Sequence, residues 1–96
     1  MAKLKVFTVY DSKVEAYAQP FFCRTIGEAL RSWEGACNDG QSMMSKHPGD
    51  FTLFEVAEFD EKTGTFHPRE TKNNLGLAIE QKRSAAPAPL DRPRAI

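Results

Sequence analysis

The sequence predicts an α+β domain: a small, mainly antiparallel sheet of four to five strands with one amphipathic helix packed on it. Two observations predict this class. One segment, residues 25–40, repeats apolar residues at helical spacing, and several short segments on either side of it are rich in β-branched and aromatic residues. The resulting order is strand, short strand, helix, strand, strand, which is typical of a sheet with a helix on one face.

The first expected strand covers residues 4–10, LKVFTVY. Both of its alternating faces carry apolar groups, which places it in the centre of the sheet. Asp11 and Ser12 give a turn signal behind it. Residues 13–17, KVEAY, alternate polar and apolar side chains and are expected to return as a short second strand that ends before Pro20.

The helix has a clear beginning and end. Thr25 and Glu28 have the spacing of a capping box, in which each side chain accepts an otherwise unpaired backbone N–H. Gly40 is expected to end the helix in a left-handed conformation, and Phe22 is expected to pack against its first turn. The residues at helical spacing are Ile26, Ala29, Leu30, Trp33, Ala36 and Cys37.

The second half of the chain predicts a β-hairpin. Residues 51–59 form a strand, with 52, 54 and 56 on one face and 53, 57 and 59 largely on the other. Residues 60–64 are expected to turn, with Gly64 at positive φ, into a partner strand that starts at 65 and ends near His67-Pro68. Asn73-Asn74 marks another turn. Residues 75–80 suit either a short strand or a helical turn.

Composition limits the possible functions. The chain has 96 residues, enough for one modest core, which we assign to residues 1–81, with 82–96 as a flexible tail rich in Pro, Ala and Arg. Residues 1–81 carry 9 basic and 12 acidic side chains, a net charge of −3, whereas residues 82–96 carry +3. Nucleic-acid binders usually show a basic excess, so DNA binding here requires a local patch, the tail or an oligomer.

Neither a membrane span nor a disulfide framework is expected. No segment approaches the roughly 20 apolar residues of a spanning helix. The N-terminal residues lack a signal-peptide cleavage site, so an intracellular protein is expected. Two cysteines, Cys23 and Cys37, fit reduced thiols, with Cys37 on the buried side of the helix.

No catalytic, cofactor or metal site is predicted. His47 and His67 are twenty residues apart, and no pair of histidines or cysteines has the spacing of a zinc site. A Cys23–His47 pair is not placed by any motif. Glu55 and Glu58 are expected at a solvated strand edge. We therefore expect a protein that is not an enzyme.

Aromatic and basic residues alternate near the N-terminus. On an open sheet face, aromatic rings stack bases while Lys and Arg pair with phosphates, which suits single-stranded nucleic acid. In the alternative interpretation Phe7, Phe21 and Phe22 belong to the core and the lysines are solvated. Pro48 to Asp50 is explained by a bend into the next strand, which leaves Lys46 and His47 as further candidates or as exposed turn residues. The candidate nucleic-acid-binding residues are Lys5, Tyr10, Lys13, Tyr17, Phe22, Arg24, Lys46 and His47.

Three motifs together resemble one viral family. These are YDSKVEAY, then PFF before the helix, and KHP-x-DFTLFE-x-x-x-FD-x-x-TG. In this combination the chain resembles the small nonstructural protein of gokushovirus-type microviruses (Microviridae), which are phages with circular single-stranded DNA genomes. The resemblance spans roughly residues 3–80 and excludes the tail. It implies a protein of the bacterial host cytoplasm that is absent from the virion and is regarded as DNA-binding or replication-related.

Two functions follow as expectations. In the first, the protein binds single-stranded DNA during genome replication or packaging control. In the second, it is a homo-oligomeric adaptor, such as a dimer, that acts on the phage replication initiator, the procapsid or a host replication factor. The resemblance carries no catalytic motif, so it implies no catalytic residue.

Overall fold

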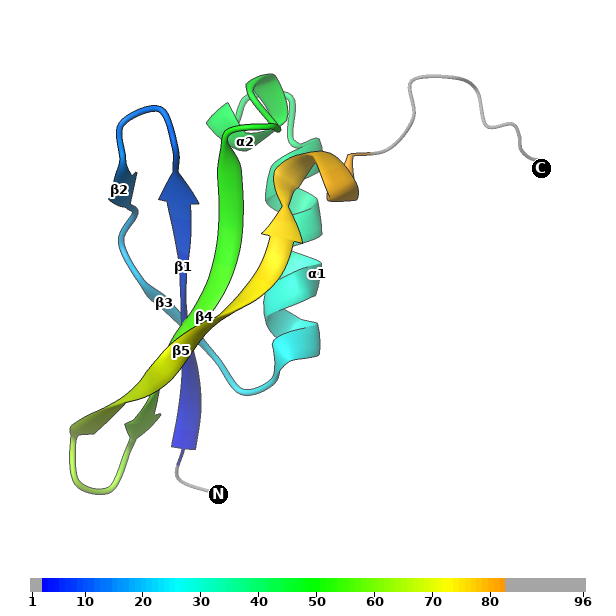
Figure 1. Ribbon diagram of the computed structural model, residues 1–96. Helices are drawn as coiled ribbons and strands as arrows, with labels where there is room; N and C mark the ends of the chain where they lie inside the picture. Colours follow the sequence, from blue (N-terminus) through cyan, green and yellow to red (C-terminus); the bar gives the residue numbers. More distant parts are fainter. Residues whose placement is uncertain (1–2, 83–96) are drawn as a thin grey trace, which may run out of the picture.

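The computed structural model describes residues 3–82. Five strands form one antiparallel sheet: β1 (Lys3–Asp11), β2 (Ala16–Tyr17), β3 (Phe21–Cys23), β4 (Phe51–Asp60) and β5 (Thr65–Leu77). β1 is central, with β2 and β3 beside one edge and β4, then β5, beside the other (Figure 1). The helices are α1 (Ile26–Asn38), α2 (Met43–Lys46) and the 3₁₀ helix η1 (Ala78–Gln81). The predicted α+β class is confirmed.

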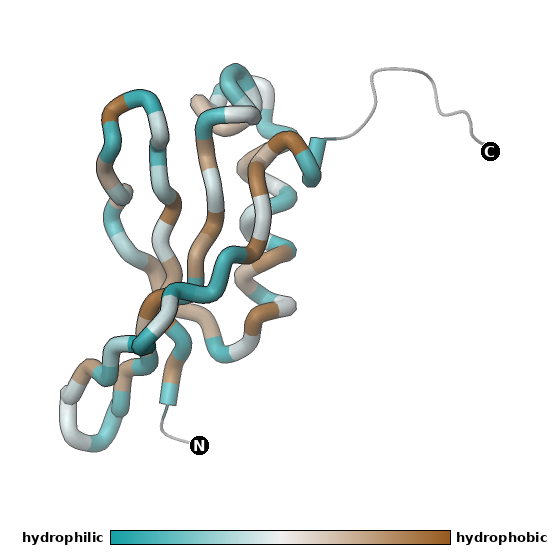
Figure 2. The backbone as a smooth tube through the Cα atoms, viewed as in Figure 1, coloured by the Kyte–Doolittle hydropathy of each residue, from teal (hydrophilic) through white to brown (hydrophobic). Residues whose placement is uncertain are grey.

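Helix α1 covers one face of the sheet and builds the core. Its tube alternates brown and teal stretches, as expected for a helix with one buried side (Figure 2). The capping box forms as predicted: Thr25 Oγ1 accepts the backbone N–H of Glu28 at 3.1 Å, and Glu28 Oε1 accepts that of Arg24 at 2.7 Å. The buried core consists of Phe7, Ala29, Trp33, Cys37, Phe51, Leu53 and Ala78.

A bulge in β4 changes which residues share a face. Phe7 pairs with Glu55, but the preceding Val6 pairs with Ala57, so Val56 is an extra residue. Cross-strand partners point to the same face, which puts Ala57 and Phe59 on the face of Phe54 and away from α1. The predicted placement of Ala57 and Phe59 on the Leu53 face was therefore wrong, because strict alternation does not continue through a bulge.

Strand β5 is longer than predicted. His67-Pro68 and Asn73-Asn74, expected to end a strand and to mark a turn, lie within it. Pro68 is tolerated because β5 is at the edge of the sheet, where a missing N–H breaks no ladder. Residues 75–77 complete β5 and residues 78–81 form η1. The segment 75–80, for which the sequence allowed either a strand or a helical turn, therefore contains both. Gly64 has the predicted positive φ, +72°.

Three local expectations were wrong. Gly40 does not take the left-handed conformation; α1 ends instead at Asn38 and is capped by Asp39, whose backbone is extended and whose N–H bonds to the carbonyl of Ala36. Phe22 belongs to strand β3 and packs away from α1. Of residues 13–17 only 16 and 17 are in a strand, because Glu15 adopts a φ of +59° in the turn. The predicted tail, apart from Lys82, lies outside the described residues.

Candidate nucleic-acid interface on the open sheet face

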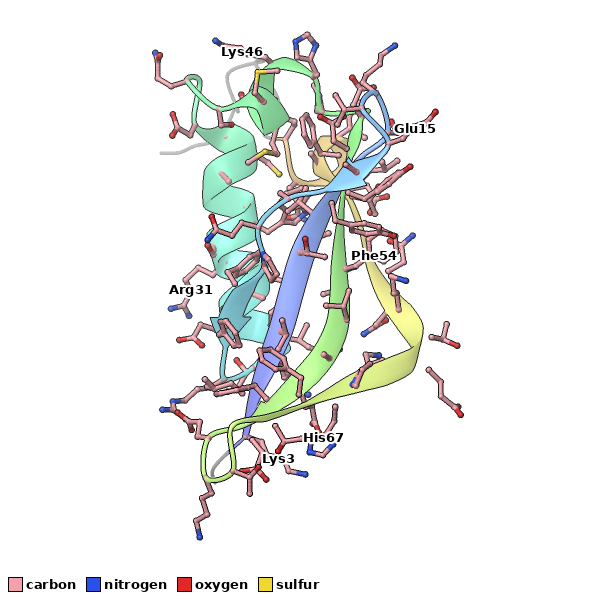
Figure 3. All side chains as sticks on the ribbon, turned by 90° about the vertical axis from the view of Figure 1, so that its left-hand side faces the viewer. Lys3, Glu15, Arg31, Lys46, Phe54 and His67 are labelled. Carbon is pink, nitrogen blue, oxygen red and sulfur yellow. The ribbon has the colours of Figure 1, made fainter. Side chains whose placement is uncertain are left out.

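The sheet face away from α1, here called the open face, carries two aromatic clusters. The tyrosine cluster consists of Tyr10, Tyr17 and Phe54. The rings of Tyr10 and Tyr17 are 4.8 Å apart between centroids, and Phe54 meets Tyr17 edge-on at 6.0 Å. Phe54 lies on the side of β4 away from α1 (Figure 3). Tyr17 is 46% exposed, so its ring forms a platform open to solvent.

The phenylalanine cluster consists of Phe22, Phe59 and Phe66. Their centroids lie 4.8 Å apart for Phe59 and Phe66, 5.6 Å for Phe22 and Phe59, and 6.1 Å for Phe22 and Phe66. Phe22 and Phe66 are 45% and 54% exposed. Exposed rings gathered on one surface are typical of an interaction site, whereas apolar residues scattered singly over a surface are ordinary.

Strand pairing puts the two clusters on the same face. Tyr10 pairs with Tyr17, and Val6, four residues earlier on β1, pairs with Phe22. Between the clusters Val6 and Thr8 are buried, and Thr8 Oγ1 donates a 2.7 Å hydrogen bond to the carbonyl of Ala18. The open face therefore has an aromatic platform at each end of β1, and the two platforms are separated by buried residues.

The selected cations Lys5 and Arg24 are paired with carboxylates, and Lys5 lies on the α1 face of β1, because its cross-strand partner Cys23 packs against the core. Lys5 Nζ lies 3.5 Å from Glu55, and Arg24 Nη1 lies 3.6 Å from Glu61. Lys72, which sequence reasoning did not select, places its ammonium 5.7 Å from the centroid of the Tyr17 ring. Within residues 3–82, Lys72 is thus the cation that lies over an aromatic ring of the open face.

Among the residues that the structure describes, Glu55 is the charged side chain that is buried. It is 1% exposed and accepts a 3.0 Å hydrogen bond from the Asn73 amide, while Lys5 and Arg69 lie 3.5 and 3.7 Å from its second oxygen. The expectation that Glu55 sits at a solvated edge was wrong, because β4 lies between β1 and β5. Its partners come from β1 and β5, so the sequence around Glu55 carries no signal of its burial.

The remaining candidates lie at the α2 end of the molecule. Lys13, in the β1–β2 turn, and His47, which follows α2, line one shallow cavity of about 210 Å³ together with Asp11, Val14, Met43, Asp50 and Phe51. Lys46 is exposed at the end of α2 (Figure 3). The cavity brings Lys13 and His47 together, but two aspartates share it, so it is not a purely cationic phosphate site.

The thiols show no sign of activation. Burial raises the pKa of the Cys37 thiol to about 11 and, together with the Glu28 carboxylate, raises that of Cys23. A nucleophilic thiol requires the opposite shift. In the described part of the chain no three His, Cys, Asp or Glu residues are grouped to hold a metal ion. Over the same residues, no helix is long and apolar enough to span a membrane.

Comparison with known proteins places the chain in a family. Residues 4–81, which include all but the first residue of the sheet, α1 and both aromatic clusters, match the sequence model of the family described as Phage ORF5 protein. The chain belongs to this phage protein family. No curated protein and no solved structure matched it.

In this Phage ORF5 family member, Tyr10, Tyr17 and Phe22 lie together on the open face, as three of the selected residues. Sequence reasoning missed Lys72 and the phenylalanines Phe54, Phe59 and Phe66. Aromatic residues on alternating strand positions gave a partial signal for Phe54. The positions of Phe59 and Phe66 depend on the bulge at Val56, for which the sequence carries no marker.

Proposed function

We propose that this protein is a non-enzymatic, nonstructural protein of a gokushovirus-type microvirus that binds single-stranded DNA through the open face. Binding would occur in the bacterial host cytoplasm, during genome replication or the control of packaging. The observation that carries the proposal is the pair of exposed aromatic platforms, Tyr17 and Phe22 with Phe66, on one sheet face. Each base stacked on an aromatic ring contributes about 1–3 kcal/mol without requiring a particular sequence.

The charge distribution specifies how such binding would work. Because Lys5 lies on the α1 face and Arg24 is paired with Glu61, few of the selected cations remain for phosphates on the open face, and stacking must provide most of the affinity. Binding that rests on stacking loses less affinity with salt than binding that rests on phosphate contacts. We therefore expect a modest salt dependence and a preference for single strands, whose bases are free to stack.

The test is fluorescence anisotropy with a labelled single strand of about 30 nucleotides, longer than most single-domain sites, beside a duplex of equal length. Tyr17→Ala and Phe22→Ala should each weaken binding by about fivefold or more, the loss of one stacked base. Ile79→Ala is the matched control, because Ile79 is 55% exposed on η1 rather than on the open face. Equal affinity in all four proteins, or no binding, would reject the proposal.

A second candidate function is a homo-oligomeric adaptor for a phage or host replication or packaging protein. It is favoured by the exposed rings of Phe22 and Phe66, next to which Arg24 is paired with Glu61, so this end of the open face has an apolar surface whose neighbouring cation is neutralised. The phenylalanine cluster would then pack against a second copy. Sedimentation velocity distinguishes the two: a dimer that Phe66→Ser converts to a monomer, together with no DNA binding, would favour the adaptor.

A further inference from the structure

Strand β5 makes an excursion beside the tyrosine cluster. Pro68 pairs with Ala57 and Asn73 pairs with Glu55, so four residues of β5, 69–72, stand opposite the single residue Val56 of β4. Extra residues in one strand leave the ladder and bend the chain. β5 bends away from β4 in its middle part (Figure 3). The excursion therefore carries Lys72 out of the regular edge.

The buried Glu55 carboxylate holds both ends of this excursion. Arg69, its first residue, lies 3.7 Å from Glu55 Oε2, and Asn73, immediately after it, donates to Glu55 Oε1 at 3.0 Å. Arg69 also donates from Nε to the carbonyl of Thr71 at 3.0 Å, within the excursion. These contacts fix the path of the backbone that ends at Lys72, so the position of Lys72 is built into the fold.

Lys72 covers the part of Tyr17 that would receive a base. The other neighbours of the Tyr17 ring are Tyr10, tilted at 4.8 Å, and Phe54, edge-on at 6.0 Å. The Lys72 ammonium is 5.7 Å from the ring centroid. An exposed cation–π contact is weaker than base–aromatic stacking, so a base can replace the ammonium on the ring.

We propose that Tyr17 and Lys72 form a one-nucleotide subsite in which they exchange partners. The incoming base stacks on Tyr17 and displaces the Lys72 ammonium, which then pairs with a phosphate next to that base. Glu55 is the positioning residue, because it holds the excursion that keeps Lys72 within reach of both the Tyr17 ring and the phosphate. This inference rests on the single-stranded DNA function proposed above and assigns the role of each residue within it.

The experiment measures the Kd of a labelled oligothymidine over a tenfold range of salt for the wild-type protein and for Lys72→Ala. Loss of one phosphate contact on a single strand lowers the slope of log K against log salt by about 0.7. When the salt concentration rises tenfold, the factor by which affinity falls should therefore be about five times smaller for the variant than for the wild type. Because Lys72→Ala also uncovers Tyr17, the two lines should cross, with the variant weaker at low salt and tighter at high salt.

Arg31→Ala serves as the matched control. Arg31 is an exposed cation on α1, on the other side of the sheet, so its removal changes the net charge equally and should give a line parallel to the wild type. As a second readout, the Lys72 side-chain methylene protons should show a ring-current shift in the free protein that disappears at saturation with oligothymidine.

The outcomes separate this inference from the proposed function. Crossing lines and loss of the ring-current shift support the exchange. If the wild type binds but the Lys72→Ala line is parallel to it, or lies below it at every salt, the exchange is overturned and the DNA-binding function stands. If the wild type does not bind oligothymidine or any other single strand, both fall together.

Discussion

The side-chain amide of Asn73 on β5 donates a 3.0 Å hydrogen bond to Glu55, a carboxylate with 1% exposure in the middle of β4. Lys5 on β1 and Arg69 on β5 lie near the second carboxylate oxygen. One side chain thus joins three strands of the sheet by polar contacts, at the point where the bulges in β4 and β5 interrupt the ladder.

Replacing Glu55 by alanine should lower the free energy of unfolding by about 2–3 kcal/mol, because it removes a buried hydrogen-bonded charge and leaves Asn73 without an acceptor. The loss stays below that of a fully buried pair, since Lys5 and Arg69 are partly exposed and can be hydrated. Urea denaturation measures the change. Glu58→Ala is the control: its 4.0 Å ion pair with Lys3 is exposed and should contribute at most about 0.5 kcal/mol. Equal losses in the two variants would contradict the assigned role of Glu55.

Replacing each of two glycines by alanine should change the free energy of unfolding in opposite directions. Gly76 has a φ of +111°, and a Cβ at this position would lie 2.6 Å from Glu80 Oε1. We expect Gly76→Ala to cost about 1–3 kcal/mol, because an L residue is strained at this φ. Gly35 lies inside α1, and the space that a Cβ would occupy there is open to 4 Å within the described residues. Gly35→Ala should therefore stabilise the protein by about 1 kcal/mol.

Thermal or urea unfolding of both variants checks the pair. The double variant Gly76→Ala/Glu80→Ala separates the two causes at Gly76, because it removes the carboxylate and keeps the backbone strain. If the double variant recovers the wild-type free energy of unfolding, the contact with Glu80, rather than the φ angle, causes the destabilisation by Gly76→Ala.

The sequence was sufficient for features that depend on neighbours along the chain. The capping box of Thr25 and Glu28 and the turn at Gly64 depend on residues a few positions apart, and both formed as predicted. The same holds for the spacing of apolar residues that buries Ala29 and Trp33 under the sheet. Local hydrogen bonds and helical periodicity decide these features, so local patterns contain the information.

The sequence was insufficient for features that depend on the register between paired strands. The extra residue Val56 turns Phe59 to the open face, and the partners of Glu55 come from β1 and β5, at least 14 residues away along the chain. A one-residue change in register moves every following side chain to the other face. The sequence could bring Tyr10 and Tyr17 together because they flank one short turn, whereas the phenylalanine cluster requires β3, β4 and β5 in register.

Stability should fall at alkaline pH through Cys37. Burial raises the pKa of its thiol to about 11, above the ordinary value of 9.0, with a smaller opposing effect from Lys82. The folded state therefore holds this proton where the unfolded state has lost it. The contribution of the neutral thiol is complete below pH 9 and is lost as the pH rises from 9 towards 11, by an amount on the order of 2 kcal/mol.

Comparison with Cys37→Ala isolates this effect from other changes in the protein at alkaline pH. The difference in free energy of unfolding between wild type and variant, measured by urea denaturation, should be constant from pH 7 to about 8.5 and shrink by pH 11. A difference that stays constant over the whole range would show that the Cys37 thiol is not held in its neutral form by burial.

The phenylalanine cluster should contribute stability before any ligand binds. Phe59 and Phe66 face each other across the β4–β5 hairpin with centroids 4.8 Å apart and planes inclined by 51°. Such aromatic pairs contribute about 0.5–1.5 kcal/mol beyond the area they bury. A double-mutant cycle with Phe59→Ala, Phe66→Ala and the double variant should give a coupling energy in this range, measured by urea denaturation at concentrations where sedimentation shows a monomer. Coupling near zero in the monomer would mean that the two rings meet only when a second molecule covers them. That result would favour self-association through the open face over DNA binding.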